Sequence, residues 1–195
     1  MPPGIEALSL ADWANAVVAA ADRAGYDRFV LVGHSLAGLT ICETARLGPD
    51  RVARLVFVSA LVPPDGSNGL DAMPADMMQR FANGLTEDAV RSMFCSDLDE
   101  EQAQFVLDNV GTDAPQIMLE PVSRSGIPAH LPKTFVRLLR DCALAPAAQD
   151  ASIAALRAVP GGEVDVVELD TGHDVMVGHP VELAALLDDL AAAAV

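Results

Sequence analysis

The sequence predicts an α/β fold built on a mostly parallel sheet flanked by helices. Short, continuous apolar runs are typical of strands that are buried on both faces of a parallel sheet. Segments with apolar residues at helical spacing alternate with these runs, which favours βαβ units. The predicted strands are residues 29–33, 54–60, 134–139 and 163–169, and the predicted flanking helices are residues 10–21, 36–47 and 180–193.

The ends of the predicted helices carry recognisable signals. Ser9 followed by Asp12 resembles an N-cap with an acidic residue three positions later. Gly25 is expected to end that first helix, and Gly48-Pro49 to end the second. Pro180 suits the first turn of the last helix. Local signals and apolar spacing therefore agree along most of the chain.

The alternation of strands and helices is interrupted between Pro63 and Pro132. Helical patterns occupy this interval at residues 75–83, 87–94 and 99–109. We predict that residues 1–63 and 132–195 form the core and that residues 64–131 form a helical cap over the carboxyl edge of the sheet. The alternative is that the interval is a long crossover connection.

Composition narrows the function classes. The 195 residues are 51% hydrophobic and 21% charged, which is typical of a globular domain. A net charge of −16, with Lys133 as the single lysine, argues against nucleic acid and anionic membranes as partners. The N-terminus has no secretory pattern and no apolar run reaches membrane-spanning length, so a cytoplasmic location is expected. The three cysteines lack metal-ligand spacing, and we expect neither a metal nor another cofactor.

The strongest chemical signal is the segment Gly33-His34-Ser35-Leu36-Ala37-Gly38, which follows a predicted strand and opens a predicted helix. A serine in this context sits on a tight turn with its hydroxyl exposed above the sheet. The backbone N–H of Leu36 would face a developing oxyanion at the helix N-terminus. Ala37 departs from the usual second glycine but is still small. The alternative is an ordinary N-cap serine at a glycine-rich turn.

The segment LVGHSLAGL resembles the nucleophile elbow of the α/β-hydrolase family. The following segment RLVFVSALVPPDG resembles the next strand and loop in the branch that contains plant methylesterases and hydroxynitrile lyases. The resemblance extends from Ser9 to the end of the chain. It implies an α/β-hydrolase fold and a catalytic triad in the chain order serine, acid, histidine, which this sequence offers.

His173 is the candidate base, because it follows the last predicted strand at the edge where such folds bind ligands. His179 directly precedes a proline at a helix start, so a structural role is expected there. His130, near the end of the predicted cap, is expected at the surface. His34 holds the position that the family uses for packing or for lining the pocket, and we expect it to contact substrate. Met176 could line the pocket from the other side or pack in the core.

Asp141 is the candidate acid, because it ends a predicted strand and the family places its triad carboxylate in such a turn. It would hold the tautomer of the imidazole and stabilise the imidazolium. The alternative is a turn-forming aspartate. Asp170 and Asp174 are closer to His173 in sequence, but they belong to the same loop and would orient its ring less well. Both remain possible.

The resemblance also implies an N-terminally incomplete version of the fold. About two strands and a helix normally precede the first helix of this sequence, and they carry the second oxyanion-hole donor. Without them, the strand 29–33 would be an exposed apolar edge through which the chain could self-associate. The chain could therefore be a truncated product or a non-catalytic descendant.

The predicted function is that of a serine hydrolase, in which Ser35, Asp141 and His173 cleave a small or medium apolar carboxylic ester through an acyl-enzyme. The alternative is a residual hydrolase-like protein that binds ligands without efficient turnover. A cyanohydrin lyase is disfavoured, because that branch has lysine after its histidine and this chain has Asp174. Relatives that use an aspartate nucleophile are disfavoured by Ser35.

Overall fold

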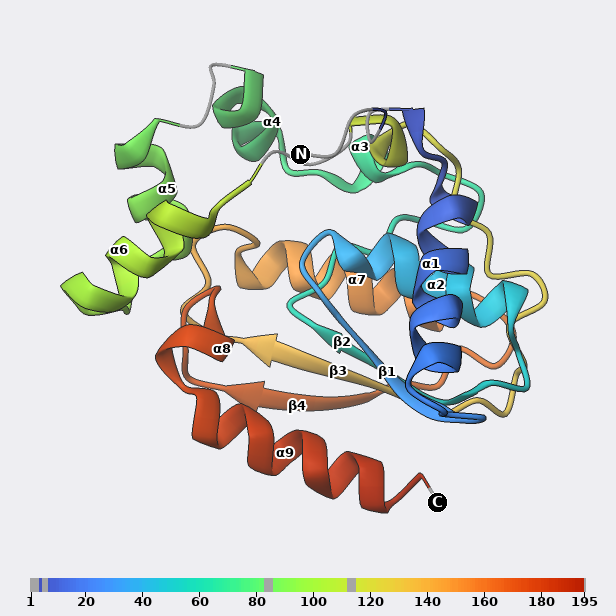
Figure 1. Ribbon diagram of the computed structural model, residues 1–195. Helices are drawn as coiled ribbons and strands as arrows, with labels where there is room; N and C mark the ends of the chain where they lie inside the picture. Colours follow the sequence, from blue (N-terminus) through green and yellow to red (C-terminus); the bar gives the residue numbers. More distant parts are fainter. Residues whose placement is uncertain (1–3, 5–6, 83–85, 112–114, 195) are drawn as a thin grey trace.

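A computed structural model describes residues 4, 7–82, 86–111 and 115–194. Its centre is a parallel sheet with helices on both faces (Figure 1). The strand order is β1-β2-β3-β4, so each strand lies beside the next one along the chain. The strands are β1 (Phe29–His34), β2 (Val52–Val58), β3 (Lys133–Leu138) and β4 (Asp165–Leu169). The predicted parallel α/β architecture is confirmed, and each strand lies within about two residues of its predicted position.

The parallel register places the carboxyl ends of the strands at one edge of the sheet. His34 at the end of β1 pairs with Val58, Val58 pairs with Val136, and Leu138 pairs with Leu169. Every residue of β2 is buried, as its apolar run predicts for an inner strand. The loops that follow β1, β2, β3 and β4 therefore meet, which brings distant parts of the sequence together.

Two apolar layers enclose the sheet. Helices α1 (Leu10–Arg23), α2 (Ala37–Leu47) and α7 (Pro146–Arg157) cover one face and contribute to a core around Phe57 and Phe135. Helix α9 (Pro180–Ala192) covers the other face. Helix α7 is a structural element that the sequence reasoning did not predict, although Pro146 at its first turn is a start signal.

The predicted end signals of the first helix are present. Ser9 Oγ accepts a hydrogen bond from the backbone N–H of Asp12 at 3.1 Å, and the Asp12 carboxylate accepts one from the Ser9 backbone N–H at 2.9 Å. This reciprocal pair is a capping box. Gly25 follows the helix with φ of 77°, a left-handed conformation that favours glycine.

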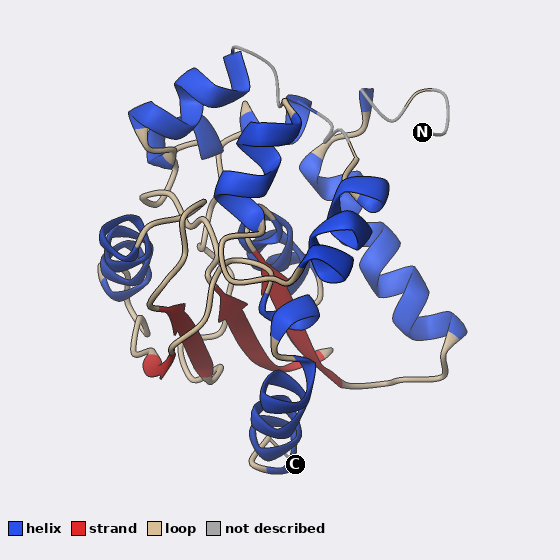
Figure 2. Ribbon diagram, turned by 90° about the vertical axis from the view of Figure 1, so that its left-hand side faces the viewer, coloured by secondary structure: helices blue, strands red, loops and turns tan. Residues whose placement is uncertain are grey.

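Residues 64–131, which we call the cap segment, place α4, α5 and α6 on the side of the carboxyl ends of the strands, and the end of the segment returns to the start of β3 (Figures 1 and 2). Three predicted helices are present within one residue of their predicted bounds, except that residue 83 lies outside the described residues. Helices α3 and η2 were not predicted. The division of the chain into core and cap stays a prediction. The elements are α3 (Gly69–Ala72), α4 (Ala75–Ala82), α5 (Glu87–Phe94), α6 (Glu100–Asn109) and η2 (Pro115–Met118).

The two outer strands of the described sheet differ in chemistry. The β1 edge is apolar, and its Val32 is 40% exposed. The β4 edge carries Asp165 and Glu168, and Glu168 pairs with Arg137 at 3.1 Å. Charged edges resist pairing with other chains, whereas apolar edges invite it. Self-association through β1 stays a prediction. None of the helices in the described ranges combines the length and the apolar character that a membrane crossing requires.

Candidate active site

Ser35 sits on a strained turn between β1 and α2. Its φ is 53°, a left-handed value that is uncommon for a residue other than glycine. The turn is fixed by the sheet, because the Ser35 backbone N–H donates to Val58 O at 3.1 Å and its carbonyl accepts from Leu61 N–H at 2.9 Å. The neighbouring strand thus holds the serine in a conformation that it would otherwise avoid.

Small residues on both sides of Ser35 let α2 approach the strands. A Cβ at Gly33 would lie 2.8 Å from Ile41 Cδ1, which is closer than side chains pack. A Cβ at Gly38 would lie 3.1 Å from Ala60 Cβ and would collide with the Leu61 carbonyl. Helix α2 therefore comes closest to the backbone that follows β2 at Gly38. For this reason Ala37 is tolerated where the usual pattern has its second glycine.

His173 follows β4 and is almost fully buried, with 2% of its surface exposed. Its Nδ1 lies 2.7 Å from Asp141 Oδ2, within hydrogen-bonding distance. Its ring also contacts the Phe94 ring, with centroids 5.3 Å apart. The imidazole is therefore oriented by a carboxylate from one loop and packed against an aromatic ring from the cap segment.

Asp141 follows β3 and is enclosed by donors. Its Oδ2 also accepts a hydrogen bond from Ser59 Oγ at 2.6 Å, while its Oδ1 accepts from the backbone N–H groups of Ala143 at 2.8 Å and Leu144 at 2.7 Å. Burial alone would raise the pKa of Asp141, but His173, Ser59 and the Leu144 N–H hold it below its usual value. The carboxylate is therefore kept ionised.

Ser59 was not singled out by the sequence reasoning. It lies just after β2, is fully buried, and has φ of 37°. Its backbone N–H donates to Val136 O at 2.9 Å, which fixes the hydroxyl beside Asp141. Nothing in its local sequence distinguishes it from an ordinary serine at a strand end, because its partner Asp141 lies in a turn 82 residues later.

Neither rival acid binds the His173 ring in the described structure. The Asp170 carboxylate lies 3.1 Å from Arg140 Nε at the surface. Asp174 lines the pocket, and in the described part of the chain its carboxylate has no hydrogen bond. Burial raises the pKa of Asp174, His173 opposes this, and the nearby Asp141 and Asp97 carboxylates add smaller upward effects. The carboxylate at His173 Nδ1 is therefore that of Asp141.

His34 lies between the serine turn and the histidine loop. Its Nε2 lies 3.0 Å from the backbone carbonyl oxygen of His173, and the two rings are 4.5 Å apart. Burial, reinforced by the neighbouring His173, lowers the pKa of His34 to about 3. A carbonyl oxygen only accepts, so the neutral His34 must donate through Nε2. It ties the loop to the turn without serving as a base there.

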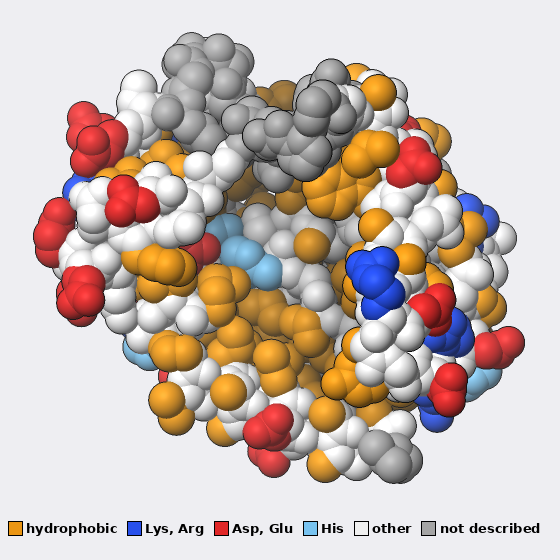
Figure 3. All heavy atoms as spheres, in the orientation of Figure 1, with side chains coloured by type: hydrophobic (Ala, Val, Ile, Leu, Met, Phe, Trp, Pro, Cys, Tyr) orange, Lys and Arg blue, Asp and Glu red, His pale blue; other side chains and the backbone are white. Residues whose placement is uncertain are grey.

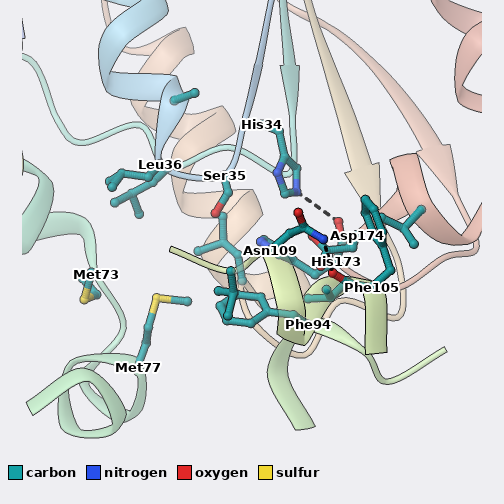
Figure 4. A pocket seen from close by; sticks show the side chains of 16 residues that line it. His34, Ser35, Leu36, Met73, Met77, Phe94, Phe105, Asn109, His173 and Asp174 are labelled. Atoms are coloured by element: carbon teal, nitrogen blue, oxygen red, sulfur yellow. Dashed lines mark hydrogen bonds between the residues drawn. The ribbon is translucent and has the colours of Figure 1, made fainter. Parts of the chain in front are cut away.

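Ser35, His34 and His173 open into one pocket of about 460 Å³ (Figures 3 and 4). Figure 3 shows histidine side chains in a hollow that is bordered by hydrophobic side chains. Within the described residues, no hydrogen bond joins the Ser35 hydroxyl to His173, although both line this pocket. The apolar lining comes mostly from the cap segment and α2: Leu36, Ala37, Leu61, Met73, Met77, Phe94, Phe105, Val106, Val110, Leu144 and Val177.

The expectation for Met176 is corrected. It is 38% exposed and is not among the lining residues, whereas the next residue, Val177, is. Both belong to the one-turn helix α8 (Val175–Gly178), in which successive side chains point in different directions. His130 is exposed, and His179 lies near Asp97 and Glu182. Met73 and Met77 of the cap segment also line the pocket.

A metal ion is a weak fit to the polar group in the pocket. Each of His34, His173 and Asp174 offers one ligand atom, and these atoms lie within 4.8 Å of one another. Ligand atoms in a tetrahedral zinc site with bonds near 2.1 Å are only about 3.4 Å apart. His34 Nε2 is also engaged with a backbone carbonyl. The expectation of a metal-free site stays a prediction.

Comparison with known proteins agrees with the observed turn and sheet. A model of the alpha/beta hydrolase family matches residues 2–186. The chain belongs to the alpha/beta hydrolase family. Among curated relatives of this alpha/beta hydrolase is Lipase LipV of Mycobacterium tuberculosis, which is 29% identical over 198 residues covering 89% of this chain and 72% of that protein.

Solved structures share the fold. An extracellular alpha/beta-hydrolase from a Paenibacillus species aligns with a TM-score of 0.77 and 22% identity, over 94% of this chain and 80% of that one. Polyneuridine aldehyde esterase aligns with a TM-score of 0.76 and 16% identity, over 97% and 82%. The resemblance carried by the serine turn is thus confirmed for the family and the fold.

Proposed function

We propose that this alpha/beta hydrolase is a serine esterase that cleaves carboxylic esters through an acyl-enzyme. The observation that carries the proposal is that His173, whose ring lies 2.7 Å from Asp141, lines the same pocket as the strained Ser35. Serine, acid and base lie on three loops at one edge of the sheet. A nucleophile, a base and a group that orients the base are what acyl transfer requires.

The proposed reaction has two steps. His173 Nε2 accepts the proton of Ser35 Oγ as the oxygen attacks the ester carbonyl, and the same proton then goes to the leaving alcohol. Water attacks the acyl-serine in the second step and releases the carboxylic acid and the free serine. Asp141 stabilises the imidazolium that forms in each step. The backbone N–H of Leu36, directly before α2, would donate to the oxyanion.

The pocket supports a small or medium, uncharged and largely apolar ester. Its volume of about 460 Å³ suits a small ligand. Figure 4 shows Met73 and Met77 on one side of Ser35, and Asp174 and Phe105 on the other. The methionine side offers flexible apolar contact. The other side combines an aromatic ring with a carboxylate, which would repel an anionic substrate.

The second candidate is a protein that binds such ligands without efficient turnover. It is favoured by one observation, the missing hydrogen bond between Ser35 and His173 in the described structure. In apo enzymes, however, such catalytic hydrogen bonds are often long and tighten only with substrate. The two candidates differ in whether the acyl-serine is hydrolysed.

Hydrolysis of p-nitrophenyl butyrate by the wild type and by Ser35→Ala tests the proposal. We expect multiple turnovers in the wild type, a loss of at least about a thousandfold in the variant, and a Tm close to that of the wild type. An organophosphonate should label Ser35 once per chain. Stoichiometric labelling without turnover would favour the ligand-binding candidate, and full activity of Ser35→Ala would exclude the proposed chemistry.

A further inference from the structure

Asp97 of the cap segment reaches into the loop that carries His173. It lies between α5 and α6, and its side chain is only 6% exposed. Its Oδ2 accepts a hydrogen bond of 2.5 Å from the backbone N–H of Gly172, the residue directly before His173. A cap residue thus fixes the peptide group that leads into the proposed base.

The buried charge of Asp97 is compensated by residues outside the cap segment. Arg140 Nη2 lies 3.6 Å from its Oδ2, and His179 Nε2 lies 3.7 Å from the same oxygen. A buried carboxylate is costly unless it is paired and hydrogen-bonded. Because its donor and both basic neighbours lie on the loops around His173, the carboxylate favours a docked cap.

His173 is consequently held from three directions. His34 binds its backbone carbonyl at 3.0 Å, Asp141 binds its ring at 2.7 Å, and Asp97 binds the N–H of the preceding residue. Arg140 fixes the earlier part of the loop, because its side chain donates to the Asp170 carbonyl and its backbone N–H donates to the Thr171 carbonyl. Of these contacts, the one from the cap segment, made by Asp97, fixes the peptide group next to the proposed base.

We propose that Asp97 is a positioning residue that makes the catalytic geometry of His173 depend on the docked cap segment. The proposal rests on the proposed role of His173 as base. A second cap contact acts in the same direction, since Gln102 Nε2 donates to the Val177 carbonyl at 3.2 Å. Substrate would enter between the cap and the sheet, so the element that encloses the substrate also aligns the base.

The first test compares Asp97→Ala with two matched variants. Asp97→Ala should lower kcat for p-nitrophenyl butyrate about 10- to 100-fold, with little change in KM, because the base is misplaced while the apolar pocket persists. Asp97→Asn keeps an acceptor for the Gly172 N–H and should retain most of kcat. Asp99→Ala is the control, because Asp99 caps α6 in the same loop and should affect Tm rather than kcat.

The second test uses Gly172, where a Cβ would collide with the Asp97 carboxylate. It would lie 2.7 Å from Asp97 Cγ and closer still to Oδ1. The backbone of Gly172 is not in the left-handed region, so alanine is otherwise allowed. Gly172→Ala should therefore lower kcat as Asp97→Ala does. In the Asp97→Ala background it should add less than about threefold, since the collision partner is gone.

A third readout is independent of turnover. The downfield proton resonance of the hydrogen bond between His173 Nδ1 and Asp141 should broaden or shift in Asp97→Ala and persist in Asp97→Asn and Asp99→Ala. An inactive wild type would count against the esterase, whereas this resonance would still report on positioning. The positioning role is overturned if Asp97→Ala leaves both the resonance and kcat unchanged, or if Gly172→Ala costs the same in both backgrounds.

Discussion

Two aspartates beside His173 occupy opposite environments. Asp141 accepts hydrogen bonds from Ser59, from two backbone N–H groups and from the His173 ring. Asp174 faces the pocket and, in the described structure, accepts none. The pKa of Asp141 lies below its usual value, although burial works against this, whereas burial raises the pKa of Asp174. Burial alone therefore does not determine the charge of a carboxylate; the number of donors aimed at it does.

This difference assigns separate tasks to the two groups. A carboxylate with a lowered pKa remains ionised and can stabilise an imidazolium, as an acid partner of a catalytic histidine must. A carboxylate without donors cannot orient the ring, but it sets the electrostatic potential of the space that a substrate enters. The four predictions below separate these tasks by changing one carboxylate at a time.

Replacing Asp141 with asparagine should have the largest effect. The amide is similar in shape but uncharged, and its NH₂ group cannot accept from His173 Nδ1, so the wrong tautomer of the ring is favoured. We expect kcat for p-nitrophenyl butyrate to fall about 10³- to 10⁴-fold. Asp174→Asn in the same assay should stay within about threefold of the wild type. Equal losses in the two variants would contradict the assignment of Asp141 as the acid.

Thermal unfolding at pH 7 should show the next largest difference between Asp141 and Asp174. Asp141→Asn should destabilise the fold by about 1–3 kcal/mol, because buried donors lose their charged acceptor. The lowered pKa of Asp141 means that its contribution is present above its unfolded pKa and is lost as pH falls through the folded value. The Tm deficit of Asp141→Asn should therefore shrink toward acidic pH. A deficit that grows on acidification would contradict this assignment.

Asp174→Asn should act in the opposite direction. A raised pKa means that the stabilising contribution is complete below the unfolded pKa of 3.8 and is lost as pH rises through the folded value. At pH 7 the ionised carboxylate therefore costs stability, and the amide should raise Tm. The gain should grow as pH rises from the unfolded pKa of 3.8 through the folded value, and then level off. A lower Tm at pH 7 would show that Asp174 has a partner after all.

The sequence alone predicts the proposed triad and the serine turn well. Ser35, Asp141 and His173 follow strands or loops with recognisable patterns, and the parallel register makes those loops meet at one edge. The local signals for β1 and α2 are strong, because Gly33 and Gly38 are demanded by backbone packing. Features that depend on close backbone approach leave a trace in the sequence.

Other parts of the site depend on contacts between distant segments. Ser59 meets Asp141, and Asp97 meets Gly172 across 75 positions, and neither contact has a local pattern. Met176 was placed in the pocket by its distance from His173, but one residue of helix rotation directs Val177 there instead. Helix α7 was not predicted, although Pro146 marks its first turn. Side-chain direction and tertiary partners are what the sequence alone left open.

The smallest predicted effect concerns substrate charge, and it isolates the role of Asp174. Two p-nitrophenyl esters of equal length are compared: the butyrate, which is neutral, and the mono-ester of succinic acid, which carries a carboxylate. The Asp174 carboxylate should disfavour the anionic ester through repulsion across the pocket. Asp174→Asn should therefore raise kcat/KM for the succinate ester about two- to fivefold relative to the butyrate ester, and added salt should reduce the difference.

Asp170→Asn is the matched control, because Asp170 lies on the same loop but is 78% exposed and faces Arg140 rather than the pocket. If Asp170→Asn gives the same gain, the effect comes from the net charge of the chain, and Asp174 has no selective role.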